Sequence, residues 1–142
     1  MNSSNSKGFI LIELIIVIAI IAILSAIVIP IYQRYQQKSK IASFALPLVR
    51  ACAGDALTFC MSNRVSGVSN ITMNVTSLPN CKNATATASG SLNMTITGTF
   101  TCEASGHISN GTVTGELEGV SLYKAQCTLN QKSINCQVLP KF

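Results

Sequence analysis

The chain has 142 residues, of which 48% are hydrophobic and only 11% are charged. This length allows one modest domain together with one long helix, and so high a hydrophobic content is unusual for a soluble domain. The formal net charge of +5 is too small to indicate a nucleic-acid-binding protein by itself.

An apolar run extends from Phe9 to Ile29, and within it only Glu13 and Ser25 are not plainly apolar. About 20 apolar residues span the hydrocarbon core of a bilayer in a helix that rises about 1.5 Å per residue. No other stretch of the sequence is hydrophobic on this scale. The run therefore predicts a transmembrane helix over residues 9–30, on which the rest of the chain is carried.

The carboxylate of Glu13 is the unusual feature of this run. An ionised carboxylate inside a membrane segment costs about 2.5–3.5 kcal/mol on insertion scales. One explanation is that Glu13 lies near the interface, where it stays hydrated, or that it is protonated. The other is that it pairs with a positive group. If the chain were cut between Gly8 and Phe9, the new α-amino group of Phe9 would lie one helical turn from Glu13, in the same chain or in a neighbouring one.

The N-terminus reads Lys7-Gly8-Phe9-x-Leu11-Ile12-Glu13-Leu14, followed by the apolar run, Pro30, Tyr32 and Tyr35. Over residues 1–35 this order resembles the N-terminus of a type IV pilin precursor. Ile10 stands where such precursors frequently have threonine, which does not affect the expected processing. Beyond residue 35 the resemblance is one of architecture and not of sequence.

The resemblance implies that residues 1–8 are a leader peptide, removed by a membrane-embedded prepilin peptidase that then methylates the amine of Phe9. It further implies that Glu13 neutralises the N-terminus of an adjacent subunit as pilins leave the inner membrane and pack into a helical filament. A secretory signal fits the leader less well, because the apolar region is too long and its small residues never fall two apart. A plain membrane anchor is the other alternative.

The basic residues around the helix do not by themselves determine on which side of the membrane the head lies. Lys7 precedes the helix, whereas Arg34, Lys38 and Lys40 follow it, which the positive-inside rule would read as a cytoplasmic C-terminal part. Long domains translocate largely regardless of charge, and a high cysteine content indicates an oxidising compartment. We therefore expect the precursor in the bacterial inner membrane with its head in the periplasm, and the mature chain in an extracellular pilus.

The helical pattern continues after Pro30, with apolar residues at a spacing of three to four over residues 31–61. Pro30 is expected to kink the helix without ending it, and Pro47 makes a second such point. Gly54 weakens the last turns, so the helix is expected to end near Cys60 or Met61. One face of this second half should be buried against a globular head.

Residues 62–142 are rich in Ser, Thr, Asn and Gly, and several segments alternate apolar and polar residues as half-buried strands do. Residues 61–90 show little periodicity and are interpreted as a connecting loop with at most one short strand. A turn is expected at residues 130–133, and another connection at Gly115–Gly119. A helix followed by strands predicts an α+β fold in which an antiparallel sheet covers the helix, as in pilins. The predicted strands are Ile71–Val75, Leu92–Phe100, Val120–Leu129 and Ile134–Leu139.

Six cysteines stand in the head and the end of the helix, and six allow fifteen pairings. Zinc is disfavoured because the chain has no C-x-x-C pair and one histidine, His107. Cys127 and Cys136 flank the last predicted hairpin and are the favoured disulfide; the resemblance to pilins points to the same pair. Cys52 and Cys60 cannot bond to each other in a helix, since eight residues rise about 12 Å. They are expected to pair with Cys81 and Cys102 in an order that the sequence leaves open.

Nothing in the sequence predicts an enzyme, a cofactor or a metal site. It lacks a Ser/His/Asp arrangement, a glycine-rich phosphate loop and a pair of carboxylates placed for acid–base chemistry. His107 is expected in a loop. The acidic residues of the head are interpreted as solvated surface charges: Asp55, Glu103, Glu116 and Glu118.

Three functions remain open. The first is a major pilin that polymerises into a fibre for adhesion, twitching motility or DNA uptake, with prepilin peptidase, other pilin subunits and the pilus assembly machinery as partners, and DNA or host surfaces as candidate ligands. The second is a minor pilin or a type II secretion pseudopilin, and the third is a monomeric membrane-anchored binding module. Pseudopilin heads often use calcium, and this sequence has no acidic cluster for it. A DNA-binding variant would require one basic face, formed by Arg50, Arg64, Lys82, Lys124, Lys132 and Lys141.

Overall fold

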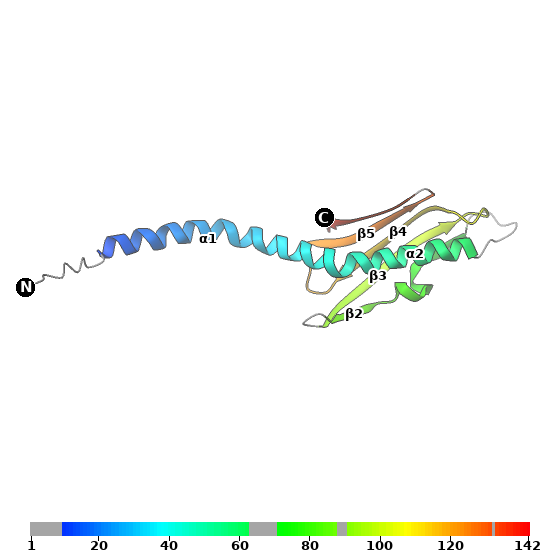
Figure 1. The fold of residues 1–142 in the computed structure, drawn as a ribbon, viewed down its shortest axis with the longest axis horizontal. Helices are drawn as coiled ribbons and strands as arrows, with labels where there is room; N and C mark the ends of the chain where they lie inside the picture. The colour runs from blue at the N-terminus through cyan, green and yellow to red at the C-terminus, as the bar shows by residue number, and fades with distance from the viewer. Residues whose placement is uncertain (1–9, 63–70, 88–90, 132) are drawn as a thin grey trace, which may run out of the picture. The chain divides into compact units, whose positions relative to one another are not determined.

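The computed structural model describes residues 10–62, 71–87, 91–131 and 133–142, and the chain divides into two compact units, residues 1–35 and 36–142. The long helical part comes first along the chain and the strands afterwards, with two short 3₁₀ turns between the first two strands (Figure 1). The helical elements are α1 (Leu11–Lys40), the π-turn η1 (Ile41–Ala45), α2 (Leu46–Ser62) and two short 3₁₀ turns, η2 (Val75–Ser77) and η3 (Pro79–Cys81). The strands are β1 (Ile71–Asn74), β2 (Ala84–Thr87), β3 (Ser91–Cys102), β4 (Ile108–Leu117), β5 (Tyr123–Asn130) and β6 (Ser133–Pro140).

The two prolines within the helical pattern are accommodated in different ways. Helix α1 continues through Pro30 without ending, as expected. Before Pro47 the chain forms the π-turn η1, in which the Leu46 N–H donates to the Ile41 carbonyl. Such turns occur where a helix loses a regular i→i−4 bond. The hydroxyl of Ser43 donates to the carbonyl of Ser39 at 2.9 Å and so satisfies a group near this irregularity.

Helix α2 ends at Ser62, within two residues of the predicted end. Its buried residues recur at spacings of three and four, which places them on one side of the helix. The sheet covers this side, so the predicted α+β arrangement of a long apolar helix and an antiparallel sheet is confirmed. Figure 1 shows α2 lying across one face of the strands. The buried residues of α2 are Val49, Cys52, Ala53, Ala56 and Cys60.

The sheet has six strands, all antiparallel to their neighbours, in the order β1-β3-β4-β5-β6, and β2 also pairs with β3. The last hairpin pairs Asn130 with Ser133, as the predicted turn requires. Two strand predictions are wrong. Strand β4 was missed, and Gly115 lies within it instead of in a connection. The segment of residues 61–90 holds β2 in addition to β1, and so contains more than the single short strand expected there.

Glycine at position 115 explains both the missed strand and the close packing of the head. A Cβ atom at Gly115 would overlap the Cγ2 atom of Val49 on α2. The helix can therefore approach β4 closely only because this position has no side chain. Phe100 on β3 packs edge-on against Phe59 of α2, with ring centroids 6.1 Å apart. The sheet contributes to the same core Met94, Ile96, Phe100, Val113, Leu117, Ala125, Cys127 and Leu129.

Candidate functional site

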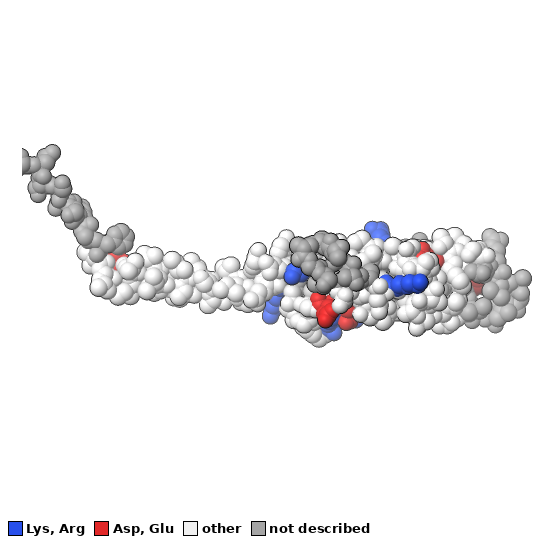
Figure 2. Space-filling view, turned by 90° about the horizontal axis from the view of Figure 1, so that it is seen from below, with Lys and Arg blue, Asp and Glu red and all other residues white. Residues whose placement is uncertain are grey.

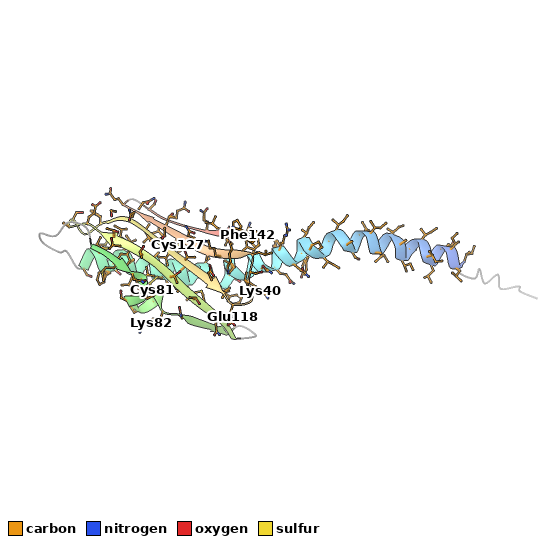
Figure 3. The ribbon with its side chains drawn as sticks, turned by 180° about the vertical axis from the view of Figure 1, so that it is seen from behind. Lys40, Cys81, Lys82, Glu118, Cys127 and Phe142 are labelled. Atoms are coloured by element: carbon orange, nitrogen blue, oxygen red, sulfur yellow. A yellow bond between two sulfur atoms is a disulfide. The ribbon has the colours of Figure 1, made fainter. Side chains whose placement is uncertain are left out.

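The part of α1 within residues 11–35 exposes its apolar side chains. No residue of α1 is buried, and large side chains such as Ile23 and Leu11 expose 65% and 75% of their surface. Figure 3 shows these side chains radiating from the helix. By length and composition, the continuous helix of residues 11–62 is the one helix of the described chain that could cross a membrane. Exposure of so large an apolar surface to water is unfavourable, so we expect lipid or other helices to cover it.

Glu13 lies in the first turn of this helix, where its backbone N–H donates to the Ile10 carbonyl at 2.9 Å. A carboxylate in the first turn is favoured by the helix dipole. In the described residues Glu13 has no ion-pair partner within its own chain, and the side chains around it along the helix are aliphatic. The predicted cleavage and methylation residues, Gly8 and Phe9, lie outside the described residues. The pairing of Glu13 with the amine of Phe9 therefore stays a prediction.

Three disulfides fasten the head. Cys127 and Cys136 lie directly opposite each other on β5 and β6 and are bonded, which is the pair that the sequence favours. The two helical cysteines pair as Cys52 with Cys81 and Cys60 with Cys102. The order that the sequence leaves open is thus set by the fold: η3 lies beside the middle of α2, whereas the end of β3 lies beside its last turn.

Each acidic side chain of the head has a hydrogen-bonding or ionic partner. Asp55 on α2 accepts hydrogen bonds from the backbone N–H and the side-chain amide of Asn80, both at 3.0 Å. It is half-buried, and it connects α2 to η3 beside the Cys52–Cys81 disulfide. The interpretation of Asp55 as a solvated charge is therefore wrong. The other three contacts are Glu103 with Gln131, Glu116 with Lys141, and Glu118 with Asn93.

No local sequence pattern indicates two further contacts, which lie at the end of the β4–β5 connection and at the C-terminus. The backbone N–H of Leu122 donates to the side-chain oxygen of Gln37 at 3.2 Å, and its carbonyl accepts from the N–H of Lys141 at 3.0 Å. Both contacts join segments more than 15 residues apart in the sequence. Polar contacts between distant segments have no local sequence pattern, so sequence reasoning could not have found them.

Among the described residues, Arg50 and Lys124 of the head do not share the single face that a DNA-binding variant would require. Arg50 is exposed on α2, whose opposite side packs on the sheet. Lys124 alternates with the buried Ala125 and therefore projects from the outer face of the sheet. Figure 2 shows the charged side chains in separated groups on a mostly uncharged surface. Arg64 and Lys132 lie outside the described residues.

Comparison with known proteins supports the reading of the N-terminus. Residues 3–29 match the family described as the prokaryotic N-terminal methylation motif. Two proteins of Dichelobacter nodosus, each named type IV major fimbrial protein FimA, are 59% identical to this chain over 39 residues. That match covers 28% of this chain and 25% of each relative. No solved structure matches the chain.

These matches identify the class of the N-terminal segment. It carries the prokaryotic N-terminal methylation motif, and over 39 residues the chain is similar to a type IV major fimbrial protein. The described part of the motif lies on α1, whose apolar side chains are exposed. The head lies outside the family match, which ends at residue 29.

Proposed function

We propose that this protein is a structural subunit of a type IV pilus. The precursor is cleaved between Gly8 and Phe9 by prepilin peptidase and N-methylated at Phe9. It then assembles with other copies through the apolar helix of residues 9–30. Residues 31–61 continue this helix into the head, and residues 62–142 form the sheet. The filament would serve adhesion, twitching motility or DNA uptake.

The observation that carries this proposal is the uncovered apolar surface of α1 with one carboxylate in its first turn. A lipid bilayer can cover the aliphatic side chains of this helix, but it gives Glu13 no counter-ion. A bundle of the same helices covers the side chains and also brings an N-terminal amine of a neighbouring copy close to Glu13. The methylation motif over residues 3–29 supports the same conclusion, because it is the segment that contains both groups.

Localisation follows from this proposal. The precursor would lie in the inner membrane with its head in the periplasm, and the mature chain would be part of the extracellular pilus. The three disulfides support an oxidising compartment for the head, since disulfides persist where thiols are not kept reduced.

The second candidate is a minor pilin or a pseudopilin, which shares the anchor but forms a tip or a short assembly. Electron microscopy of surface filaments separates it from the first. Deletion of the gene should remove the filaments, and immunogold labelling with antibodies to the head should decorate them along their whole length. Normal filaments after deletion, or label confined to filament ends, would contradict the role of major subunit.

Processing is tested independently by the mass of the chain. The mature protein from membranes of competent cells should begin at Phe9 and carry one added methyl group. An intact Met1 in the same material would contradict the proposed cleavage. It would leave a monomeric membrane-anchored binding module, the third candidate, as the better account.

A further inference from the structure

The outer face of the sheet, on the side away from α2, has an unusual composition. On β3 the buried Ile96 and Phe100 alternate with the exposed Thr97 and Thr99, so the threonines point away from the core. The same alternation holds along β4 and β5. Figure 3 shows the sheet from this side, with α2 behind it.

The strand register places these outward side chains in rows that cross the sheet. Three consecutive rows contain only threonine, serine, asparagine and glutamine. The charged residues Glu116 and Lys124 lie beyond them, toward one end of the face. The rows are Thr97–Thr114–Gln126–Gln137, Thr99–Thr112–Thr128–Asn135, and Thr101–Asn110–Asn130–Ser133.

A hollow of about 240 Å³ lies between two of these rows. In the described part of the chain, four of its polar side chains make no hydrogen bond with another residue, whereas the hydroxyl of Thr128 donates to the Asn135 carbonyl at 3.3 Å. The hollow thus offers two amide groups and two hydroxyls as unused donors and acceptors. It is lined by Thr99, Asn110, Gly111, Thr112, Thr128 and Asn130.

The chemistry of the hollow excludes most classes of ligand. Nucleic acids and other polyanions require Lys or Arg, and none lines it. A membrane or a hydrophobic peptide requires an apolar patch, and protein hot spots are rich in Trp, Tyr and Arg but poor in Thr. A sugar ring carries several neutral hydroxyls, each of which can both donate and accept, and so matches groups that do the same.

We propose that this hollow binds one sugar unit of an uncharged polysaccharide. Its volume is below the range of about 300–1,000 Å³ found for drug-sized ligands, which suits a single ring held in a longer chain. The rows of Thr, Asn and Gln continue beyond the hollow and provide further hydrogen-bonding groups along that chain. Binding at one site is weak, and linking several subunits in the proposed filament would raise the total affinity for one polymer. The proposal does not depend on filament assembly.

The test uses the purified full-length chain in a detergent without sugar headgroups. Retention is measured on beads of cellulose, starch and dextran, with heparin beads as the charged probe. The hollow variant combines Asn110→Ala and Thr112→Val, which removes two hydrogen-bonding groups at exposed positions. Thr58→Val on the exposed side of α2 is the matched control. A second hollow variant, Asn130→Gln, keeps the amide and displaces it by one methylene.

The wild-type chain and Thr58→Val should bind at least one of the three neutral polymers, and the hollow variant should bind about tenfold less. Asn130→Gln should also bind less, at an unchanged thermal unfolding midpoint. The proposal is overturned if the wild-type chain binds none of the neutral polymers, if it prefers heparin, or if both hollow variants are retained as well as Thr58→Val. Any of these results would mean that the face serves only to keep the sheet soluble.

Discussion

The two units of the chain differ in where their stabilising contacts come from. Residues 36–142 bury a hydrophobic core between α2 and the sheet and fasten it with three disulfides. Residues 11–35 bury nothing and expose aliphatic side chains along the whole helix. The head is stabilised by contacts within itself, whereas we expect the apolar side chains of the helix to be buried by lipid or by other chains.

From this difference we expect that the head determines the folding of the chain and that the N-terminal helix determines the proposed assembly. A substitution in the head should change the free energy of unfolding and leave the chemistry of the N-terminus unaffected. A substitution near the N-terminus should change processing or assembly and leave the unfolding midpoint of the head unchanged. Substitutions in the N-terminal segment and in the head can test this separation, and the largest effect is expected at the cleavage site.

Blocking the cleavage site should abolish processing and assembly and leave the folding of the head unchanged. Gly8→Arg places a long charged side chain at the bond that the peptidase must cut, so the chain should keep residues 1–8 and form no filaments. The mass of the membrane-bound protein measures this directly. Ile10→Thr, which restores the residue frequent in pilin precursors, is the control and should be processed normally. A cleaved Gly8→Arg chain would show that the motif is not used as proposed.

Removing a disulfide should affect only the head. Cys60 and Cys102 are 42 residues apart in sequence, and closing a loop of this length stabilises by about 4 kcal/mol in the chain-entropy model. The double change of both cysteines to Ala should lower the free energy of unfolding by roughly this amount.

The matched control is the pair Cys127 and Cys136, separated by only 9 residues, for which the same model gives about 2.6 kcal/mol. Chemical denaturation followed by near-ultraviolet circular dichroism ranks the two variants. Processing at Phe9 should be the same in both. An equal cost, or a larger cost for the shorter loop, would contradict this ranking.

Adding a methyl group at Gly115 should destabilise the head, because the new Cβ would overlap Val49. Overpacking of this kind costs about 1–3 kcal/mol. Gly54→Ala is the control and should raise the free energy of unfolding. A Cβ at this position meets nothing within 4 Å, and Ala favours the helix by about 0.5–1 kcal/mol.

Combining Gly115→Ala with Val49→Ala should recover part of the loss if the overlap causes it. The thermal unfolding midpoints of Gly115→Ala, Val49→Ala, the double variant and Gly54→Ala measure whether the two positions interact. Full additivity of the two single changes would show that Gly115 and Val49 do not interact, and the explanation of the close approach would then be wrong.

Neutralising single carboxylates of the head should have the smallest effects of this series, and the effect should be larger for Asp55 than for Glu116. Asp55→Asn keeps the shape but replaces one of the two acceptor oxygens by an NH2 group. One hydrogen bond from Asn80 is therefore lost and the other is no longer charge-assisted, at a cost of about 1–2 kcal/mol. Amide hydrogen exchange should rise first around η3. Glu116→Gln breaks a partly exposed ion pair with Lys141 and should cost less than about 1 kcal/mol. A larger loss for Glu116→Gln would reverse the roles assigned to the two carboxylates.

Much of the helical half could be predicted from the sequence because its signals are local. The apolar run, the spacing of buried residues after Pro30 and the weakening at Gly54 lie within single turns or a few turns of one another. The identity of the N-terminal segment rests on a short motif of the same kind. The predicted end of the helix differs from the observed end by at most two residues.

The sheet was predicted less well because its decisive interactions are not local. Strand β4 contains Gly111 and Gly115, which as local signals indicate a turn. In the fold they allow the close approach of Phe100 and of Val49. The pairing of Cys52 and Cys60 depends on which strand end lies beside each turn of α2, and no sequence spacing carries that information. The rows of outward threonines likewise become visible only once the strand register is known.

The central claim is that Glu13 acts by pairing with the N-terminal amine that cleavage at Phe9 creates. The most direct measurement is the yield of filaments, by sedimentation and electron microscopy, from cells that express Glu13→Gln in place of the wild-type chain. This change removes the charge and preserves the size of the side chain. The account predicts normal cleavage and methylation, an unchanged unfolding midpoint of the head, and filament yield reduced to a small fraction of wild type. Filaments of normal yield and length from fully processed Glu13→Gln protein would contradict it.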